Sequence, residues 1–347
     1  MKALVIGRDG NGAIQRIDRP DPASHQALVQ TIAGGLCGTD RTLIQRAFKG
    51  VPAERYPLVL GHESVGRVVQ VGANVASFDV GDVVLLPFVP APTVNGQALG
   101  SAWGAFSEFA LVDDPAAFES GKVLGTAPES AAAQSVLPKS VNPLEAPVLV
   151  TLREVLSSIK VSGIGIQAPI VLYGSGPVAM AFARLLSLLG AKQIIAVVRS
   201  EEKAALMRMF GAHLCINSTT TDVLSSVLEM IPSGVGGVID AVGQRSIVNE
   251  AMGMLADRAI VFCYGVPKGS DMSLDWSCAP DNWTLNFQQM PRKEEEGACH
   301  QQVINWAERG DLRLYEFISN FVPFDRAIEV LPEYLDGRMD GKVILTF

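Results

Sequence analysis

The feature that most constrains the fold is an alternation of apolar strands and helices in the second half of the chain. The apolar segment 169–173 leads into Gly174-Ser175-Gly176-Pro177-Val178-Ala179, and a helix to about Leu189 follows. Further strands are predicted at 193–198, 214–217, 237–241 and 259–264, with helices at 144–159, 201–210, 223–230 and 247–255. This order predicts an α/β fold with a doubly wound parallel sheet and helices on both of its faces.

The turn after segment 169–173 has the composition of a dinucleotide-binding site. Gly174 allows a tight turn, Gly176 lets the backbone approach a pyrophosphate, and Ala179 is small enough for the helix to pack on the strand. The N–H groups and the dipole at the helix N-terminus favour phosphate binding. The alternative is a glycine-rich turn that binds no ligand. The residues predicted to contact the cofactor here are Gly174, Ser175, Gly176, Pro177 and Val178.

The end of the next strand bears on the choice between NAD and NADP. An NAD enzyme places an acidic residue there to hold the ribose 2′-hydroxyl, whereas this chain has Val198. Arg199 follows, and its guanidinium is suited to a 2′-phosphate. The alternative is that Arg199 is a solvated charge and that Glu201 or Glu202 reaches the ribose. We therefore favour NADP(H), with NAD(H) as the alternative cofactor.

The first half of the chain has a strand-like pattern punctuated by Gly, Pro, Asn and Asp, which predicts a compact, mostly β domain. The predicted strands are 27–32, 64–71, 80–86 and 106–112. Residues 87–104 show no regular period and are predicted to form a loop. The C-terminal part is expected to contain helices near 299–309 and 324–335 and a strand at 342–347. The charged run 292–296 is interpreted as a solvated turn or helix end.

Possible metal ligands lie in two short clusters of the first half, Cys37-Gly38-Thr39-Asp40 and Gly61-His62-Glu63. A thiol, an imidazole and a carboxylate are the side chains that bind zinc. Structural zinc sites usually contain Cys-x-x-Cys pairs and four protein ligands, and this chain has no such pair. The two clusters therefore predict a metal site with a position open to water or substrate.

Composition limits the class of protein. A chain of 347 residues suggests two domains, and a net charge of −8 argues against a nucleic acid or an anionic membrane as partner. The five cysteines are odd in number and irregularly spaced, so they do not predict a disulfide framework. Neither a signal peptide nor a membrane-spanning run is recognised, and we expect a cytoplasmic protein that acts on a small molecule.

The order of these motifs resembles the medium-chain dehydrogenase/reductase superfamily, and in particular its zinc-dependent alcohol, polyol and sugar dehydrogenases. The matching segments are 35–40, 61–66, 71–72, 80–83, 174–178 and 240–243, which span nearly the whole chain. The resemblance implies a GroES-like, mostly-β catalytic domain at 1–145, completed by 288–347, and a Rossmann domain at 146–287. It also implies an active site in the cleft and assembly into a homodimer or homotetramer.

The resemblance further implies roles for individual residues. Cys37 and His62 would hold a single catalytic zinc ion, with Glu63 as a ligand or a close neighbour. Thr39 would take the proton of the substrate, and Asp40 would hydrogen-bond His62 and fix its tautomer. The residues that would lie near the nicotinamide are Val242, Tyr264 and Val266.

Two segments depart from the family pattern. Residues 87–104 correspond to a lobe that commonly holds a second zinc ion with four cysteines, yet they contain no cysteine. The family's third ligand of the catalytic zinc falls on Ala146, which has no donor atom; Glu145 is the neighbouring carboxylate. We therefore expect one zinc ion, held by Cys37, His62 and Glu63, with Glu145 as a further possible ligand.

Three functions are compatible with the sequence. The first is a zinc-dependent dehydrogenase that uses NADP(H) and acts on a secondary alcohol, a polyol or a sugar, or on the matching ketone or aldehyde. The second is a zinc-independent NADPH-dependent reductase of enones or quinones, which Ala146 and the missing cysteine lobe favour. The third is a non-catalytic NADPH-binding redox sensor, in which Thr39 and Asp40 would have no evident role.

Overall fold

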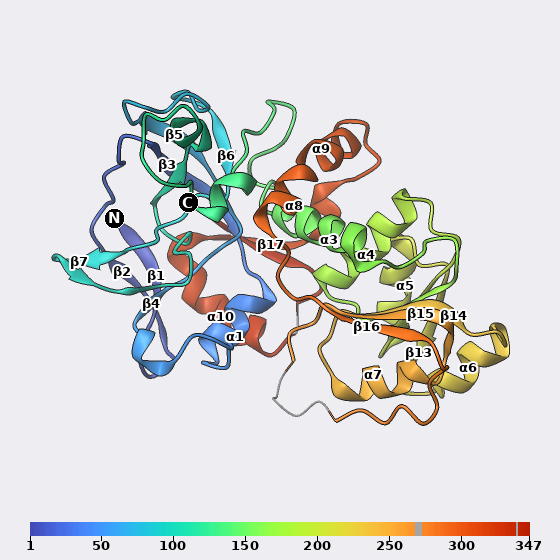
Figure 1. The fold of residues 1–347 in the computed structure, drawn as a ribbon. Coiled ribbons are helices and arrows are strands. Elements are labelled where there is room, and N and C mark those ends of the chain that lie inside the picture. Colours follow the sequence, from blue (N-terminus) through green and yellow to red (C-terminus); the bar gives the residue numbers. More distant parts are fainter. Residues whose placement is uncertain (268–272, 338) are drawn as a thin grey trace. The chain divides into compact units, whose positions relative to one another are not determined.

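The computed structural model describes residues 1–267, 273–337 and 339–347 (Figure 1). The chain forms two compact units, of which the first comprises Met1–Arg153 and Arg292–Phe347 and the second Glu154–Pro291. The first unit is therefore discontinuous in sequence. Among the described residues, no helix combines the length and the apolar character needed to cross a membrane.

The second unit is built on a parallel sheet in the spatial order β13-β12-β11-β14-β15-β16. The strands are β11 (Ile170–Tyr173), β12 (Ile194–Val198), β13 (Leu214–Asn217), β14 (Val235–Asp240), β15 (Leu255–Cys263) and β16 (Trp283–Phe287). The helices of this part of the chain are α3 (Val148–Ser162), α4 (Pro177–Leu188), α5 (Glu201–Met209), α6 (Val223–Met230) and α7 (Arg245–Met252). The chain starts in the middle of the sheet and extends to both sides, so the predicted doubly wound fold is confirmed.

The register of the sheet brings the carboxyl ends of three strands to one edge. Tyr173, the last residue of β11, pairs with Val197 of β12 and with Asp240 of β14. The turn that begins at Gly174 therefore lies at the same edge as Arg199. Ligands of doubly wound sheets bind at this edge, beside the point where the strand order reverses.

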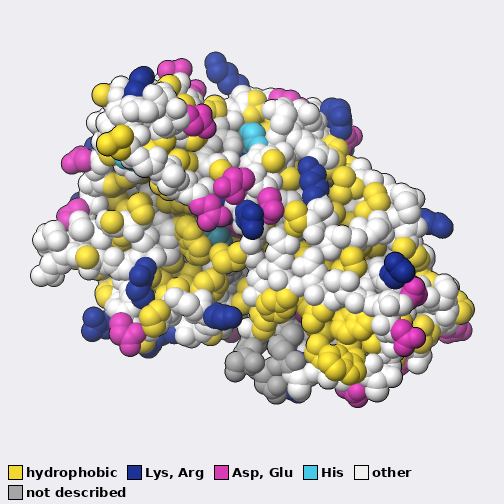
Figure 2. All heavy atoms as spheres, in the orientation of Figure 1, with side chains coloured by type: hydrophobic (Ala, Val, Ile, Leu, Met, Phe, Trp, Pro, Cys, Tyr) yellow, Lys and Arg dark blue, Asp and Glu magenta, His cyan; other side chains and the backbone are white. Residues whose placement is uncertain are grey.

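Strand β16 at the border of the sheet was not predicted from the sequence. It pairs in parallel with β15 on one side and is the last strand of the sheet. Its side chains Leu285 and Phe287 are 37% and 51% exposed, and Trp276 before it is 70% exposed. Figure 2 shows apolar side chains gathered over this part of the second unit. The strand is short and two of its five residues are polar, so the sequence signal for an edge strand is weak.

In the described residues, the first unit contains two larger sheets, a two-stranded hairpin and several short helices. One sheet has the order β2-β1-β4-β9, and the other has the order β17-β18-β3-β5-β6 with β10 on β3. The strands are β1 (Lys2–Ile6), β2 (Gly12–Arg16), β3 (Gln26–Gly35), β4 (Leu58–Val59), β5 (Ser64–Val71), β6 (Val83–Leu85), β9 (Gly100–Ser101), β10 (Phe109–Asp113), β17 (Ile318–Pro323) and β18 (Lys342–Thr346). The helices are α1 (Gly38–Ile44), α2 (Pro115–Glu119), α8 (Lys293–Ala298), α9 (His300–Glu308) and α10 (Ala327–Leu335). The mostly β character expected for this part of the chain is confirmed.

Strand β18 ties the C-terminal segment into the first unit. It pairs in parallel with β17 and antiparallel with β3, where Ile344 lies opposite Gly35. In Figure 1 the red C-terminal strands accordingly lie among the blue and cyan strands of the N-terminal segment. Residues 342–345 are buried, so this strand is part of the core.

The prediction of a loop without regular structure at 87–104 was wrong in part. Strands β7 (Thr93–Val94) and β8 (Gln97–Ala98) form a hairpin, and β9 pairs with β4. The hairpin turns at Asn95 and Gly96, whose φ angles of 49° and 76° are those of a two-residue hairpin turn. Strands of two residues are too short to produce a period, but the Asn-Gly pair was a readable signal.

The interpretation of the charged run 292–296 as a solvated turn or helix end was wrong for Glu296, whereas Arg292 and Glu294 are exposed at the start of α8. Glu296 lies in α8 and is fully buried, and its carboxylate accepts a 2.9 Å hydrogen bond from Arg153 Nη2. Arg153 is itself fully buried and also donates to the Ala133 carbonyl at 2.9 Å. A buried charge persists only when it is paired and hydrogen-bonded, so Glu296 links α8 to Arg153 of α3.

Protonation of His300 beside this ion pair is expected to destabilise the fold. Its Nδ1 lies 3.2 Å from Arg153 Nη1, and burial together with the Arg153 charge lowers the pKa of His300 to about 4. As the pH falls below about 6.5, the ordinary pKa of histidine, His300 becomes protonated in the unfolded chain. In the folded chain it stays neutral until the pH reaches about 4. The free energy of unfolding should therefore fall as the pH drops from about 6.5 to 4. The upper limit of this decrease is about 3 kcal/mol, and the partial exposure of His300 makes the decrease smaller. Denaturant titrations of wild type and His300→Gln across this range measure the effect, and equal pH slopes would contradict it.

Candidate metal centre and cofactor turn

The three donor residues of the predicted metal site come together in the first unit. Cys37 lies at the start of α1, just after β3, and His62 and Glu63 lie just before β5. Strands β3 and β5 are antiparallel, with Gly34 opposite Ser64, so these two strand ends are adjacent. One ligand atom of each residue lies within 4.8 Å of the other two. A thiol, an imidazole and a carboxylate at this spacing fit a zinc ion.

Gly61 is required by the turn that presents His62. Its φ is +105°, a conformation that favours glycine, and an added Cβ would lie 2.4 Å from the Phe106 backbone nitrogen. The Phe106 N–H also donates a 2.9 Å hydrogen bond to the Leu60 carbonyl, and this bond would break if the Phe106 backbone moved to make room for a side chain at Gly61. The sequence Gly-His-Glu therefore encodes a close backbone approach as well as two donors.

Asp40 lies between the two clusters and is fully buried. Its Oδ2 accepts a 2.9 Å hydrogen bond from the Cys37 backbone N–H, and its Oδ1 lies 3.5 Å from His62 Nδ1. The second separation is that of a loose ion pair rather than a short hydrogen bond. Burial works against a charge on His62, but the Asp40 and Cys37 charges outweigh it and raise the pKa of His62 well above its usual value. In this orientation of the His62 ring, Nδ1 faces Asp40 and Nε2 is available to bind a metal.

An aromatic ring and a hydroxyl complete the surroundings. Trp103 packs against His62 with the ring centroids 5.1 Å apart, and the Tyr334 hydroxyl donates a hydrogen bond to the Cys37 carbonyl. Thr39 is the second residue of α1 and half-buried; its carbonyl accepts a 2.8 Å hydrogen bond from the Thr42 hydroxyl. The predicted proton acceptor thus lies two residues from Cys37, on the first turn of α1.

Glu63 is held by two residues that the sequence analysis did not single out. Its Oε1 accepts a 2.9 Å hydrogen bond from the Thr151 hydroxyl, and its Oε2 forms an ion pair with Lys342 Nζ. Both Glu63 and Lys342 are almost fully buried. Burial opposes the charge on Lys342, but Glu63 and the neighbouring Cys37 raise its pKa. One indication of this ion pair is present in the sequence, a lysine at the start of strand β18 that is followed by Val343, Ile344 and Leu345.

The third ligand position of the family is occupied by a residue that cannot bind metal. Ala146 is fully buried in the turn before α3. Glu145 is half-buried, and its Oε1 accepts a 2.9 Å hydrogen bond from Asn142 Nδ2. The group of three donors formed by Cys37, His62 and Glu63 does not include Glu145.

The predicted cofactor residues of the second unit surround the turn after β11. Gly174 has a φ of +122°, and an added Cβ would lie 3.3 Å from Ala179 Cβ and from Val242 Cγ2. Gly176 has open space around the position of its missing Cβ, and Pro177 begins α4. Ser175 and Val178 complete this turn, and Arg199 is exposed just after β12. The open backbone before α4 is the feature that a pyrophosphate requires.

Asp240 organises the loop on the neighbouring strand. Its carboxylate accepts hydrogen bonds from the backbone N–H groups of Val242, Gly243 and Gln244 at 2.8, 2.9 and 3.2 Å. An added Cβ on Gly243 would lie 2.3 Å from the Val266 carbonyl oxygen, so Val266 is next to this loop. Tyr264 is buried and packs against Phe182 at 5.2 Å between ring centroids. The three residues expected near the nicotinamide thus lie close together in the second unit.

Comparisons with known proteins agree with this arrangement. Residues 23–120 match the model of the alcohol dehydrogenase GroES-like domain, and residues 177–282 match that of the zinc-binding dehydrogenases. The chain belongs to the medium-chain dehydrogenase/reductase superfamily. It is an alcohol dehydrogenase-like oxidoreductase.

Individual relatives are distant but match over most of their length. A sorbitol dehydrogenase of Gallus gallus is 26% identical over 72% of this dehydrogenase and 71% of its own chain. An NADP-dependent isopropanol dehydrogenase of Clostridium beijerinckii is 25% identical over 81% of both chains. The crystal structure of an alcohol dehydrogenase zinc-binding domain protein from Burkholderia ambifaria has a TM-score of 0.84 and 20% identity, and it covers 100% of this chain and 98% of its own. This last likeness shows the fold.

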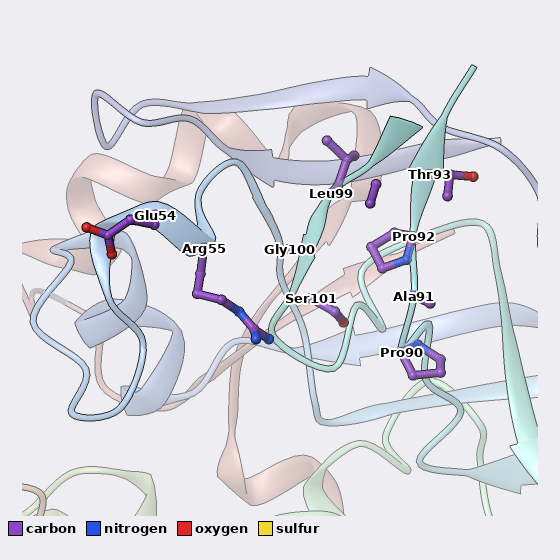
Figure 3. Close-up of a pocket in the computed structure, with 10 residues that line it drawn as sticks. Glu54, Arg55, Pro90, Ala91, Pro92, Thr93, Leu99, Gly100 and Ser101 are labelled. Carbon is purple, nitrogen blue, oxygen red and sulfur yellow. The ribbon is translucent and has the colours of Figure 1, made fainter. Parts of the chain in front are cut away.

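A shallow pocket in this dehydrogenase lies at the hairpin segment rather than at the metal centre. It has a volume of about 360 Å³ and is lined by Glu54, Arg55, Pro90, Ala91, Pro92, Thr93, Ala98, Leu99, Gly100 and Ser101. Figure 3 shows Arg55 extending toward the side of Ser101, while Glu54 points away from the other lining residues. Neither Cys37 nor His62 lines it, so the pocket is separate from the donors described above.

Proposed function

We propose that this oxidoreductase transfers a hydride between NADP(H) and a secondary alcohol, a polyol or a sugar, or the matching ketone or aldehyde, at a single metal centre. The observation that carries the proposal is the convergence of Cys37, His62 and Glu63 within 4.8 Å. Relatives named for isopropanol and sorbitol, both of which carry secondary hydroxyls, support this substrate class.

Each residue of the centre then has a task. Cys37 and His62 hold the metal, and Glu63 completes the protein ligands; a zinc ion there would act as a Lewis acid on the substrate oxygen. Asp40 keeps His62 in the orientation that directs Nε2 away from the carboxylate. The Thr39 hydroxyl would relay the proton: it accepts the proton of an alcohol while it releases its own to water, and the reverse occurs in carbonyl reduction. The turn at Gly174 and Gly176, together with Arg199, would hold NADP(H), which would supply or accept the hydride.

Metal content and turnover test this function together. Freshly purified protein should contain about one zinc per chain, and a panel of secondary alcohols, polyols and sugars should reduce NADP. A strong chelator should abolish this turnover, and added zinc should restore it.

A second candidate function is the zinc-independent reduction of an enone or quinone by NADPH. Ala146 favours it, because one position for a protein ligand is lost, and so does the engagement of Glu63 with Thr151 and Lys342. Full activity of the metal-free protein toward an enone would establish this reading over the first.

Replacement of Arg199 is expected to reverse the cofactor preference. The side chain is exposed after β12, where a guanidinium would pair with the 2′-phosphate of NADPH. A lost charge-assisted contact of this kind costs about 1.5–3 kcal/mol, so Arg199→Ala should lower kcat/KM for NADPH by about tenfold to a hundredfold and leave NADH unaffected.

The exposed Arg208 of α5 provides the matched control. Arg208→Ala removes the same charge from the same region and should preserve the ratio of the two catalytic efficiencies. A wild-type protein that prefers NADH, or an Arg199→Ala variant with an unchanged ratio, would refute the assignment of NADP.

A further inference from the structure

Each oxygen of the Glu63 carboxylate has a partner within the protein. One oxygen accepts a hydrogen bond from Thr151 at 2.9 Å, and the other is paired with the Lys342 ammonium. A carboxylate that binds a metal must direct at least one of these oxygens to the ion. A metal ion at this centre would therefore have to share the Glu63 carboxylate with the Lys342 ammonium.

The fold provides a dedicated space for Lys342. The residue begins β18, and the adjacent Val343 carbonyl accepts a 2.9 Å hydrogen bond from the backbone N–H of Leu36, next to Cys37. Gly35 lines the space: an added Cβ would lie 2.9 Å from Lys342 Cδ and 3.0 Å from Glu63 Oε2. The absence of a side chain at Gly35 thus leaves room for the ion pair.

Lys342 and a metal ion would compete for the same negative charge. The Lys342 side chain is 2% exposed, so its ammonium would be buried without a counter-charge if Glu63 moved to a metal. Burial of an unpaired charge is strongly unfavourable, and this cost is subtracted from the affinity for the metal. The same pair balances the charge of Glu63 while the centre holds no metal.

We propose that Lys342 is a positioning residue that restrains Glu63 and thereby lowers the metal affinity of the centre formed by Cys37, His62 and Glu63. The proposal rests on the function proposed above, since it assumes that these residues bind a metal. On this proposal, the contacts of Glu63 with Thr151 and Lys342 regulate how much metal the centre binds. They do not remove Glu63 permanently from the set of ligands.

Zinc titrations of the full-length protein test this idea. Lys342→Met removes the ammonium and keeps most of the side-chain volume, so the uncompensated Glu63 carboxylate should favour the metal. Competition with a chromophoric chelator should show at least about a tenfold rise in zinc affinity, and zinc should raise the Tm of the variant more than that of wild type. Lys139→Met, at an exposed position of the same unit, should leave both values unchanged.

A double-mutant cycle assigns the effect to the pair. Replacing both partners, as in Lys342→Met with Glu63→Gln, removes both charges, and the affinity gain caused by Lys342→Met should then disappear. Conversely, Lys342→Arg retains the charge and should keep the affinity of wild type. A gain that persists in the Glu63→Gln background would overturn the proposal.

Failure of this proposal differs from failure of the proposed function. If wild type and Cys37→Ser bind zinc equally weakly, the metal centre itself is refuted. If Cys37→Ser abolishes binding but Lys342→Met binds zinc no more tightly than wild type, the role of Lys342 is refuted. Should Lys342→Met not fold, Thr151→Val releases the other oxygen of Glu63 and should raise the affinity about threefold; no change in that variant would also overturn the proposal.

Discussion

Thr39→Val should lower kcat by about a hundredfold or more while the affinity for NADPH stays at its wild-type value. The substitution removes the hydroxyl assigned to the substrate proton and keeps a β-branched side chain of similar size on the first turn of α1. Loss of a positioned proton acceptor typically has an effect of this size. Steady-state kinetics with a secondary alcohol, together with cofactor titration, measure both quantities.

Two variants sharpen this experiment. Thr39→Ser keeps the hydroxyl and should retain most of the turnover. Thr42→Val removes the neighbouring hydroxyl, which is bonded to the Thr39 carbonyl at 2.8 Å, and should leave kcat close to that of wild type. If Thr39→Val turns over as fast as wild type, Thr39 does not relay the proton.

Cys37→Ser should remove both the metal and at least about a thousandfold of the activity. A Lewis acid contributes several kcal/mol to stabilisation of the developing charge, and each 1.36 kcal/mol corresponds to a factor of ten in rate. The thiolate is the charged ligand at the start of α1, and a serine hydroxyl is a much weaker ligand for zinc. Elemental analysis and turnover on the same preparation give the result.

Cys278 provides the matched control, because it is an exposed free thiol in the second unit. Cys278→Ser should keep the zinc content and the turnover of wild type. Turnover that survives in a zinc-free Cys37→Ser protein would instead support the metal-independent reductase.

The doubly wound fold was predictable because strands such as β11, β12 and β14 are short, largely apolar runs that alternate with helices. Strand β12 is buried at all of its residues, and this is why its sequence is continuously apolar. Strand β16 escaped prediction for the opposite reason: none of its residues is fully buried, and polar residues (Thr284 and Asn286) alternate with its apolar ones. Short strands such as β7 and β8 owe their position to the Asn95-Gly96 turn rather than to any period.

The candidate site was predictable only where its residues form compact motifs. Cys37, His62 and Glu63 stand in two recognisable clusters, whereas the residues that hold Glu63 are 88 and 279 positions away from it. No local pattern links Thr151 or Lys342 to Glu63, since their contact depends on how α3 and β18 pack in the first unit. The burial of Glu296 was missed for the same reason, because its partner Arg153 lies 143 residues away.

The insertion of β18 between β17 and β3 has a consequence for biosynthesis. A ribosome releases β3 and β5 early, but β18 emerges only after the whole second unit has been made. The nascent chain therefore carries Glu63 and Cys37 without Lys342 for most of its synthesis, while the second unit already has all of its strands. Because contacts between distant segments form slowly, the first unit should be the later one to reach its native state. Metal ions in the cell therefore encounter the Cys37 thiol before Lys342 has been synthesised.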